Sequence, residues 1–144
     1  MTLNRTGRCN CGAITFTAKL ATTGIHVCHC GQCQRWTGGR PYCVISVDEI
    51  DVKGEDQIRA YHASKWGERG VCGASGSTLY WKMQGKPISS IVVGLIDDQT
   101  GLGVTEEIFV DRRPPWMSPF PGATQSTEAQ EFAKLNAYLA GESS

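Results

Sequence analysis

Three cysteines lie within six positions of the segment Val27 to Gly39, VCHCGQCQRWTGG. They are Cys28, Cys30 and Cys33. In extended backbone a C-x-C pair directs both sulfurs to one side, because successive side chains alternate. Zinc binds thiolate sulfur in a tetrahedron, and the neighbouring glycines let the backbone fold around an ion. The cluster therefore predicts a metal site whose fourth position is either filled from elsewhere in the chain or left open.

The overall composition is that of one globular domain. The 144 residues are enough for a single core and are predicted to form one domain, 1–144. Fourteen basic and fourteen acidic residues cancel, so no global field attracts nucleic acid or an anionic membrane. No apolar run approaches the ~20 residues of a membrane span, and the N-terminal residues do not resemble a signal peptide. We expect a cytoplasmic protein without nucleic-acid or membrane partners, and homo-oligomerisation stays open.

The cysteine content favours metal binding over disulfides. Seven cysteines is an odd number, whereas a secreted disulfide framework favours an even number and an export signal. In a reducing compartment, clustered cysteines are more often metal ligands or catalytic thiols. Besides the central cluster there are Cys9 and Cys11 in CNCG, Cys72 in VCGASG, and Cys43 alone. Cys43, between apolar neighbours, is most simply a small buried side chain.

Short β-type segments separated by turn residues fill most of the chain. The run AITFTA, residues 13–18, alternates apolar side chains with threonines, which is the period of a half-buried strand. Further β-rich runs are YCVISV, IRAYH, STLYWKM, SSIVVGLI and EIFV. Seventeen glycines suit tight turns and argue against long helices. We therefore predict a mainly β fold of short antiparallel strands.

One helix is predicted near the C-terminus, over about 127–140. Thr127 and Gln130 form a possible capping box at its start. Gly141 is a plausible stop. Apolar residues recur at helical spacing between them, at Phe132, Leu135 and Leu139.

Several motifs together resemble a known family. RCNCGAITF, VCHCGQCQRWTG, VCGASGS, GLIDD and EIFVDRRPPW occur in an order similar to that of the glutathione-dependent formaldehyde-activating enzyme family, which is related to centromere protein V. The resemblance covers about residues 4–120. It implies a zinc-binding β-tent fold with two metal sites. A structural site would come from a C-x-C pair and a later C-x-x-C, and a three-coordinate reaction centre from C-x-C-x-x-C.

The resemblance also assigns the cysteines to these two sites. Cys28, Cys30 and Cys33 would form the open catalytic site, and the structural site would take its ligands from Cys9, Cys11 and Cys72. Ser75 stands where the family pattern has a fourth structural cysteine. A neutral serine hydroxyl is a poor ligand beside soft thiolates. The structural site could then bind zinc weakly, take up water, recruit another residue or stay empty, so we expect one or two Zn²⁺ ions.

The sulfur-rich central site favours thiol chemistry. Three thiolates around Zn²⁺ leave a local charge of −1, so a bound water is a poorer acid than in histidine sites. Such a site suits capture of a substrate thiol as a fourth ligand. The resemblance supplies the thiol, glutathione, which adds to formaldehyde to give S-hydroxymethylglutathione, or leaves in the reverse cleavage. We predict a zinc-dependent carbon–sulfur lyase acting on glutathione or a similar small thiol and an aldehyde.

A substrate with carboxylates calls for cations near this site. Arg35 and Arg40 flank the central cluster, and Arg69 precedes Cys72. Arginine forks suit carboxylates, and Trp36 could pack against a tripeptide. The competing interpretation of each arginine is a solvated surface residue.

Two further functions stay open at this point. If residues 26–30 are extended, His26 shares a face with Cys28 and Cys30 and could close the site as a Cys₃His centre. His29 then points the other way and is better explained as a hydrogen-bonding or core residue. A closed site would indicate a zinc-stabilised binding module instead of an enzyme. A thiol redox sensor that needs no metal is the third alternative.

Overall fold

The computed structural model describes residues 3–39 and 41–142. The chain divides into two compact units. The first comprises the chain up to Ile25 together with Cys43–Gly103, and the second comprises His26–Tyr42 and the chain from Val104 onward. Ten strands and two α-helices, one of them C-terminal, form in the described residues. The predicted mainly β fold with a C-terminal helix is therefore confirmed.

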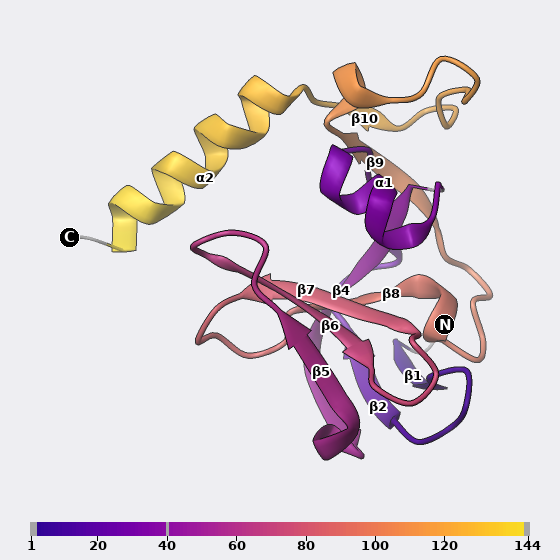
Figure 1. Cartoon of the computed structure of the whole chain (residues 1–144). Helices are drawn as coiled ribbons and strands as arrows, with labels where there is room; N and C mark the ends of the chain where they lie inside the picture. The colour runs from indigo at the N-terminus through magenta and orange to yellow at the C-terminus, as the bar shows by residue number, and fades with distance from the viewer. Residues whose placement is uncertain (1–2, 40, 143–144) are drawn as a thin grey trace. The chain divides into compact units, whose positions relative to one another are not determined.

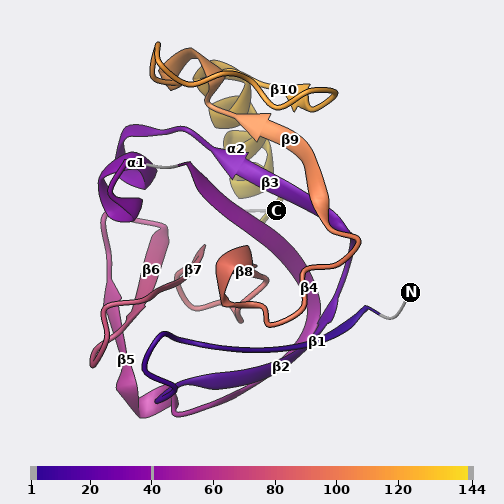
Figure 2. The same cartoon turned by 90° about the vertical axis from the view of Figure 1, so that its right-hand side faces the viewer.

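The first unit contains an antiparallel sheet built on the N-terminal hairpin. Strands β1 (Asn4–Arg8) and β2 (Thr15–Leu20) pair antiparallel, and β2 pairs in the same way with β4 (Tyr42–Lys53) (Figure 2). Strand β8 (Ser90–Val92) adds to β4 further along. The buried and exposed side chains of β2 alternate, as the AITFTA pattern predicted. The run SSIVVGLI is strand only in β8, because a 3₁₀ turn, η2 (Val93–Leu95), follows at once.

The apolar face of this sheet forms the main core. Gly7 of β1 lies opposite Phe16 of β2, and a Cβ atom at Gly7 would overlap the Phe16 ring and the Leu95 carbonyl oxygen. A glycine is therefore needed for the aromatic ring to pack against β1. The buried side chains of this core are Phe16, Ala18, Leu20, Ile45, Val47, Ile91 and Ile96.

A second antiparallel sheet of the first unit carries one of the cysteines. It consists of β5 (Ile58–Tyr61), β6 (Gly67–Cys72) and β7 (Thr78–Met83), with the 3₁₀ turn η1 (Glu55–Gln57) leading into β5 (Figure 1). Cys72, at the end of β6, packs in one buried cluster with Cys9, Ile14, Leu79 and Tyr80. The second core therefore joins Cys9, which follows β1, to Cys72 at the end of β6, 63 positions further along.

The second unit surrounds the central cysteine motif. Strand β3 (Gly24–Cys28) runs beside β9 (Gly103–Ile108) (Figure 2). Strand β9 pairs with β10 (Thr124–Gln125) in parallel, a departure from the antiparallel pattern expected. A short helix, α1 (Gly31–Thr37), follows β3 almost directly. Strand β9 begins before the predicted run EIFV and ends within it, and the 3₁₀ turn η3 (Val110–Arg112) follows.

The C-terminal helix α2 (Glu128–Glu142) begins where the capping box predicted. The Gln130 side chain accepts from the Thr127 backbone N–H at 2.8 Å, and the Thr127 hydroxyl accepts from the Gln130 N–H at 3.3 Å. The expected stop at Gly141 is wrong, since the helix continues through it. Glycine is only modestly unfavourable inside a helix, by about 1 kcal/mol, so it ends a helix only where the next backbone turns away. No helix in the described part of the chain is long and apolar enough to cross a membrane.

Candidate metal centres

The junction of β3 and α1 brings the three central cysteines together. Cys28 ends the strand, Cys30 is the N-cap of the helix in extended conformation, and Cys33 lies in the first turn. The Cys33 backbone N–H donates to Cys30 Sγ at 3.3 Å. The three sulfur atoms all lie within 4.8 Å of one another. We call Cys28, Cys30 and Cys33 the central triad.

The acid–base properties of the three central thiols are consistent with a site for a cation. Hydrogen bonding with the Cys30 and Cys33 sulfurs, burial, and the negative charge of these two neighbours all raise the pKa of the Cys28 thiol above its ordinary value. Three thiols at this spacing cannot all ionise by themselves, whereas a coordinated thiol is deprotonated by the charge of the metal. Three sulfur donors are also a ligand set that zinc accepts. The triad therefore fits Zn²⁺, and the charge of the ion would stabilise the thiolates that the three sulfurs cannot all form by themselves.

Neither neighbouring histidine belongs to the central triad. His26 is partly exposed, and its Nδ1 lies 3.4 Å from a carboxylate oxygen of Glu106. His29 is fully buried and its Nε2 lies 2.8 Å from Glu107 Oε1, in agreement with the predicted hydrogen-bonding role. Among the described residues, the group of ligand atoms around the central sulfurs contains only the three cysteines. A closed Cys₃His centre is therefore not what this structure forms.

A buried carboxylate, which the sequence did not single out, holds His29 in place. Burial alone would raise the pKa of Glu107, but hydrogen bonds from Gln125, His29 and the Phe120 backbone N–H, with the charge of Arg113, lower it to about 2. An ionised carboxylate only accepts, so His29 Nε2 carries the donated proton. This network fixes His29, the residue between Cys28 and Cys30, and so helps to orient these two ligands through the backbone.

The sequence carried only a weak signal for this carboxylate. Glu106 and Glu107 are consecutive on β9, so alternation places them on opposite faces without saying which face is buried.

The sequence also did not identify Gln34 as a residue that supports the site. Its side-chain amide donates to the His29 carbonyl at 2.7 Å and to the Arg112 carbonyl at 2.9 Å, and so ties α1 to the cysteine loop and to η3.

A second cysteine triad lies in the first unit. Cys9 follows β1, Cys11 lies two residues on, and Cys72 ends β6. Cys11 Sγ lies 3.6 Å from Cys9 Sγ and 3.7 Å from Cys72 Sγ, and all three sulfurs lie within 4.8 Å of one another. We call these three residues the first triad. All seven cysteines are thiols without disulfides, and Cys43 belongs to neither triad.

Ser75 lies directly beside the first triad. Its backbone N–H donates to Cys72 Sγ at 3.3 Å. Hydrogen bonds from the Ser75 hydroxyl and then from its backbone N–H lower the pKa of Cys72 to about 6. Burial alone would raise the pKa of Cys9, but hydrogen bonds, first among them one from the Ile14 backbone, lower it. The three sulfurs thus fit a soft cation too, while Ser75 contributes hydrogen bonds to the cluster.

A sequence profile of the glutathione-dependent formaldehyde-activating enzyme family matches residues 4–112, a span that includes both triads. The chain belongs to this family.

Two individual proteins are similar to this family member. A Schizosaccharomyces pombe protein described as an uncharacterized lyase is 30% identical over 76 residues, which are 52% of this chain and 55% of that protein. The match thus spans about half the length of the curated relative. A crystal structure of a Rhodobacter sphaeroides protein superposes with a TM-score of 0.52 at 16% identity, covering 85% of this chain and 99% of that one. The second likeness shows the fold alone.

The four residues predicted from charge and position to contact a substrate differ in their surroundings. Arg35 of α1 is exposed and donates to the Gly31 carbonyl at 3.3 Å. Trp36 is half-buried, and its ring centroid lies 5.1 Å from that of Tyr42. Arg69 is buried on β6, with 6% of its surface exposed, so little of it can reach a solute. Arg40 lies outside the described residues.

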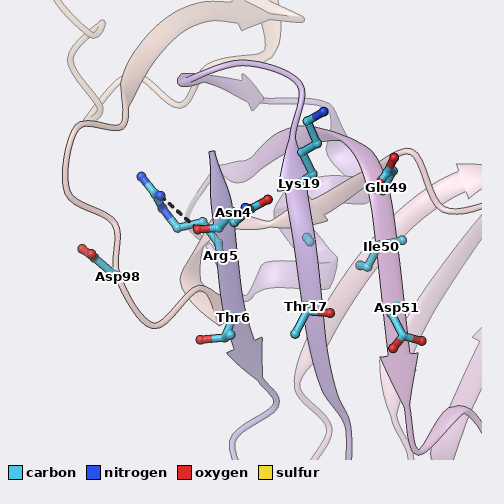
Figure 3. A pocket seen from close by; sticks show the side chains of 10 residues that line it. Asn4, Arg5, Thr6, Thr17, Lys19, Glu49, Ile50, Asp51 and Asp98 are labelled. Atoms are coloured by element: carbon cyan, nitrogen blue, oxygen red, sulfur yellow. Dashed lines mark hydrogen bonds between the residues drawn. The ribbon is translucent and has the colours of Figure 1, made fainter. Parts of the chain in front are cut away.

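The first unit also has a hollow on its surface that lacks cysteines. It measures about 710 Å³ and lies over β1, β2 and β4, where Lys19, Glu49 and Asp51 line it (Figure 3). Arg5 at its edge donates to the backbone carbonyls of Asn4 and Thr100. Because no cysteine is among its lining residues, this hollow is not the centre of the thiol chemistry expected of the family.

Proposed function

We propose that this chain is a zinc-dependent enzyme that forms or cleaves carbon–sulfur bonds, acting on glutathione or a similar small thiol and on an aldehyde such as formaldehyde. The observation that supports it most directly is the central triad. Its three sulfurs lie within 4.8 Å of one another, and in the described part of the chain no fourth side-chain ligand joins them. Three donors leave one tetrahedral position for a substrate thiol.

When bound there, Zn²⁺ supplies a positive charge that keeps a substrate thiol ionised at neutral pH. The chain contributes the ligand frame. Cys28 and Cys33 are buried, whereas Cys30 is half-buried and gives the triad its contact with solvent. Glu107 and His29 hold the backbone between two of the ligands.

Residues of α1 are suited to hold the rest of the substrate. Arg35, two residues after Cys33 in α1, is exposed, and a guanidinium has several N–H groups for a carboxylate. Trp36 offers a half-buried ring beside Tyr42. In the addition, a bond forms between the thiol sulfur and the carbonyl carbon, and the carbonyl oxygen takes up one proton while the thiol loses one. No oxidant or reductant is needed.

The test measures, for each variant, the bound zinc and the rate at which glutathione and formaldehyde exchange with their adduct. Glutathione and formaldehyde exchange with their adduct without a catalyst, so the rate is best measured at equilibrium by NMR exchange spectroscopy. We expect the zinc-loaded protein to accelerate this exchange. Cys30→Ser should lose the central metal and the acceleration while the chain stays folded, and Cys43→Ser, which alters neither triad, should retain both. Full acceleration by Cys30→Ser, or none by the loaded wild type, would contradict the proposal.

A further inference from the structure

The first triad has a serine at the place where a fourth ligand would complete a tetrahedron, and the hydrogen bonds of this serine show what it does. We propose that Ser75 serves this triad as a hydrogen-bond donor and not as a ligand, so that a soft metal ion bound by Cys9, Cys11 and Cys72 keeps an exchangeable position that a small external thiol fills. The chain would then hold two thiol-accepting centres. Thiol binding at the first triad is independent of the function proposed for the central triad.

The direction of the hydrogen bonds around Ser75 carries the first step. The Asn10 backbone N–H donates to Ser77 Oγ at 2.8 Å, and Ser77 Oγ lies 3.1 Å from Ser75 Oγ. The Ser75 backbone N–H in turn donates to Cys72 Sγ at 3.3 Å. Ser75 therefore meets the triad through its backbone N–H, while its hydroxyl is paired with Ser77.

A neutral hydroxyl in this role does not compete for a soft cation. Thiolate ligands select soft ions such as Zn²⁺ and Cu⁺, which bind a further thiolate better than an alcohol. Backbone N–H groups already stabilise two of the sulfurs, from Ile14 to Cys9 at 3.3 Å and from Ser75 to Cys72 at 3.3 Å. Such charge-assisted hydrogen bonds hold ligands in their ionised form without filling a coordination position.

The triad is also accessible and has a cation beside it. Cys9 and Cys72 are buried, but Cys11 is exposed, as are Gly73 and Ala74 of the turn that follows Cys72. Arg8 Nη1 lies 3.4 Å from the position of a Cβ atom at Gly12, directly after Cys11. A fourth thiolate would bring the charge of a zinc site to −2, and a guanidinium at this loop offsets part of it.

The experiment counts thiol binding in the Co²⁺-loaded protein, because sulfur-to-cobalt charge-transfer absorption reports each thiolate. Wild type, Ser75→Cys and Ser89→Cys are loaded with Co²⁺ and titrated with 2-mercaptoethanol. Ser89→Cys is the matched control, since it makes the same substitution at an exposed serine. We expect wild type and Ser89→Cys each to take up one more equivalent of thiol than Ser75→Cys, in which the new cysteine closes the first site.

A second variant keeps the test valid if Ser75→Cys folds poorly. Cys11→Ser removes an exposed ligand of the first triad and should also lose one equivalent. Thiol uptake that persists in Ser75→Cys belongs to the central triad, so failure of the proposed function and failure of this inference are distinguishable. Equal uptake by wild type, Ser75→Cys and Cys11→Ser would overturn the inference, because the first site would then be either closed by the protein or without metal.

Discussion

The buried carboxylate of Glu107 shows how one residue can support a cysteine site that it does not enter. It accepts from His29, from Gln125 at 2.7 Å and from the Phe120 backbone N–H at 2.9 Å, and Arg113 Nη2 lies 3.2 Å away. Its side chain has no exposed surface. A charge in that position is stable only while its partners are present.

The ionisation of Glu107 predicts a pH dependence of folding stability. Its pKa is about 2 in the folded protein and about 4.5 ordinarily. Because the folded value is the lower one, the stabilisation is complete above about pH 4.5 and is lost as the pH falls towards 2. Glu107→Gln should cost about 3 kcal/mol at pH 7, since it leaves Arg113 without its buried counter-charge.

The matching measurement is urea denaturation of both proteins between pH 3 and 7. The difference in their free energies of unfolding should shrink as the pH falls below about 4.5, because Glu107 of the unfolded wild-type chain then takes up a proton while the folded protein keeps it ionised down to about pH 2. Gln125→Glu is not a useful control, as it adds a second carboxylate, so Glu106→Gln on the same strand serves instead. A difference between wild type and Glu107→Gln that stays constant with pH would show that only packing had been altered.

At the level of elements, the turn after β4 depends on backbone geometry. Gly54 has a φ of +85°, and a Cβ atom there would overlap the Ala13 carbonyl oxygen. Gly85 follows β7 with a φ of +78°, and a Cβ atom there meets nothing within 4 Å. The two glycines share a conformation and differ only in the space around them.

This pair predicts two unequal costs. Gly85→Ala should destabilise the protein by about 1 kcal/mol, the conformational cost of the left-handed region. Gly54→Ala should cost about 3 kcal/mol, because the overlap with backbone adds to that cost. Chemical denaturation of both variants measures the difference, and equal losses would mean that the turn after β4 moves away without difficulty.

The residues at the start of each helix explain why α2 could be predicted from the sequence and α1 could not. The start of α2 depends on two neighbouring side chains, Thr127 and Gln130, and local chemistry of this kind is visible in sequence. The short α1 had no such signal, because its N-cap is a cysteine whose sulfur accepts from the Cys33 N–H. A thiol is not among the residues that usually cap helices.

Across the whole molecule, the two triads differ in the length of chain that they close. The central triad spans residues 28–33, whereas Cys11 and Cys72 are 61 positions apart. A metal that bridges distant segments restricts the unfolded chain more than one within a short segment. The first triad should therefore contribute more to folding, even with an exchangeable fourth position.

Single-cysteine variants test this difference. Cys72→Ser should lower the urea midpoint of the zinc-loaded protein more than Cys30→Ser, with Cys43→Ser as the reference for loss of a thiol outside the triads. A strong zinc chelator should lower the wild-type midpoint and abolish most of the difference. An equal effect of Cys72→Ser and Cys30→Ser would show that loop closure does not set the contribution of either site.

The sequence by itself determined what depends on neighbours in the chain. The spacing of Cys28, Cys30 and Cys33 predicted a cluster, and alternation in residues 13–18 predicted a half-buried strand, because strand and turn geometry act over a few residues. The family resemblance had assigned Cys72 to the same site as Cys9 and Cys11, but only the tertiary structure brought their sulfurs within 4.8 Å of one another and decided that Glu107 is the buried member of its pair. Each of these depends on which distant segments pack together, and packing is a property of the folded chain that no local pattern encodes.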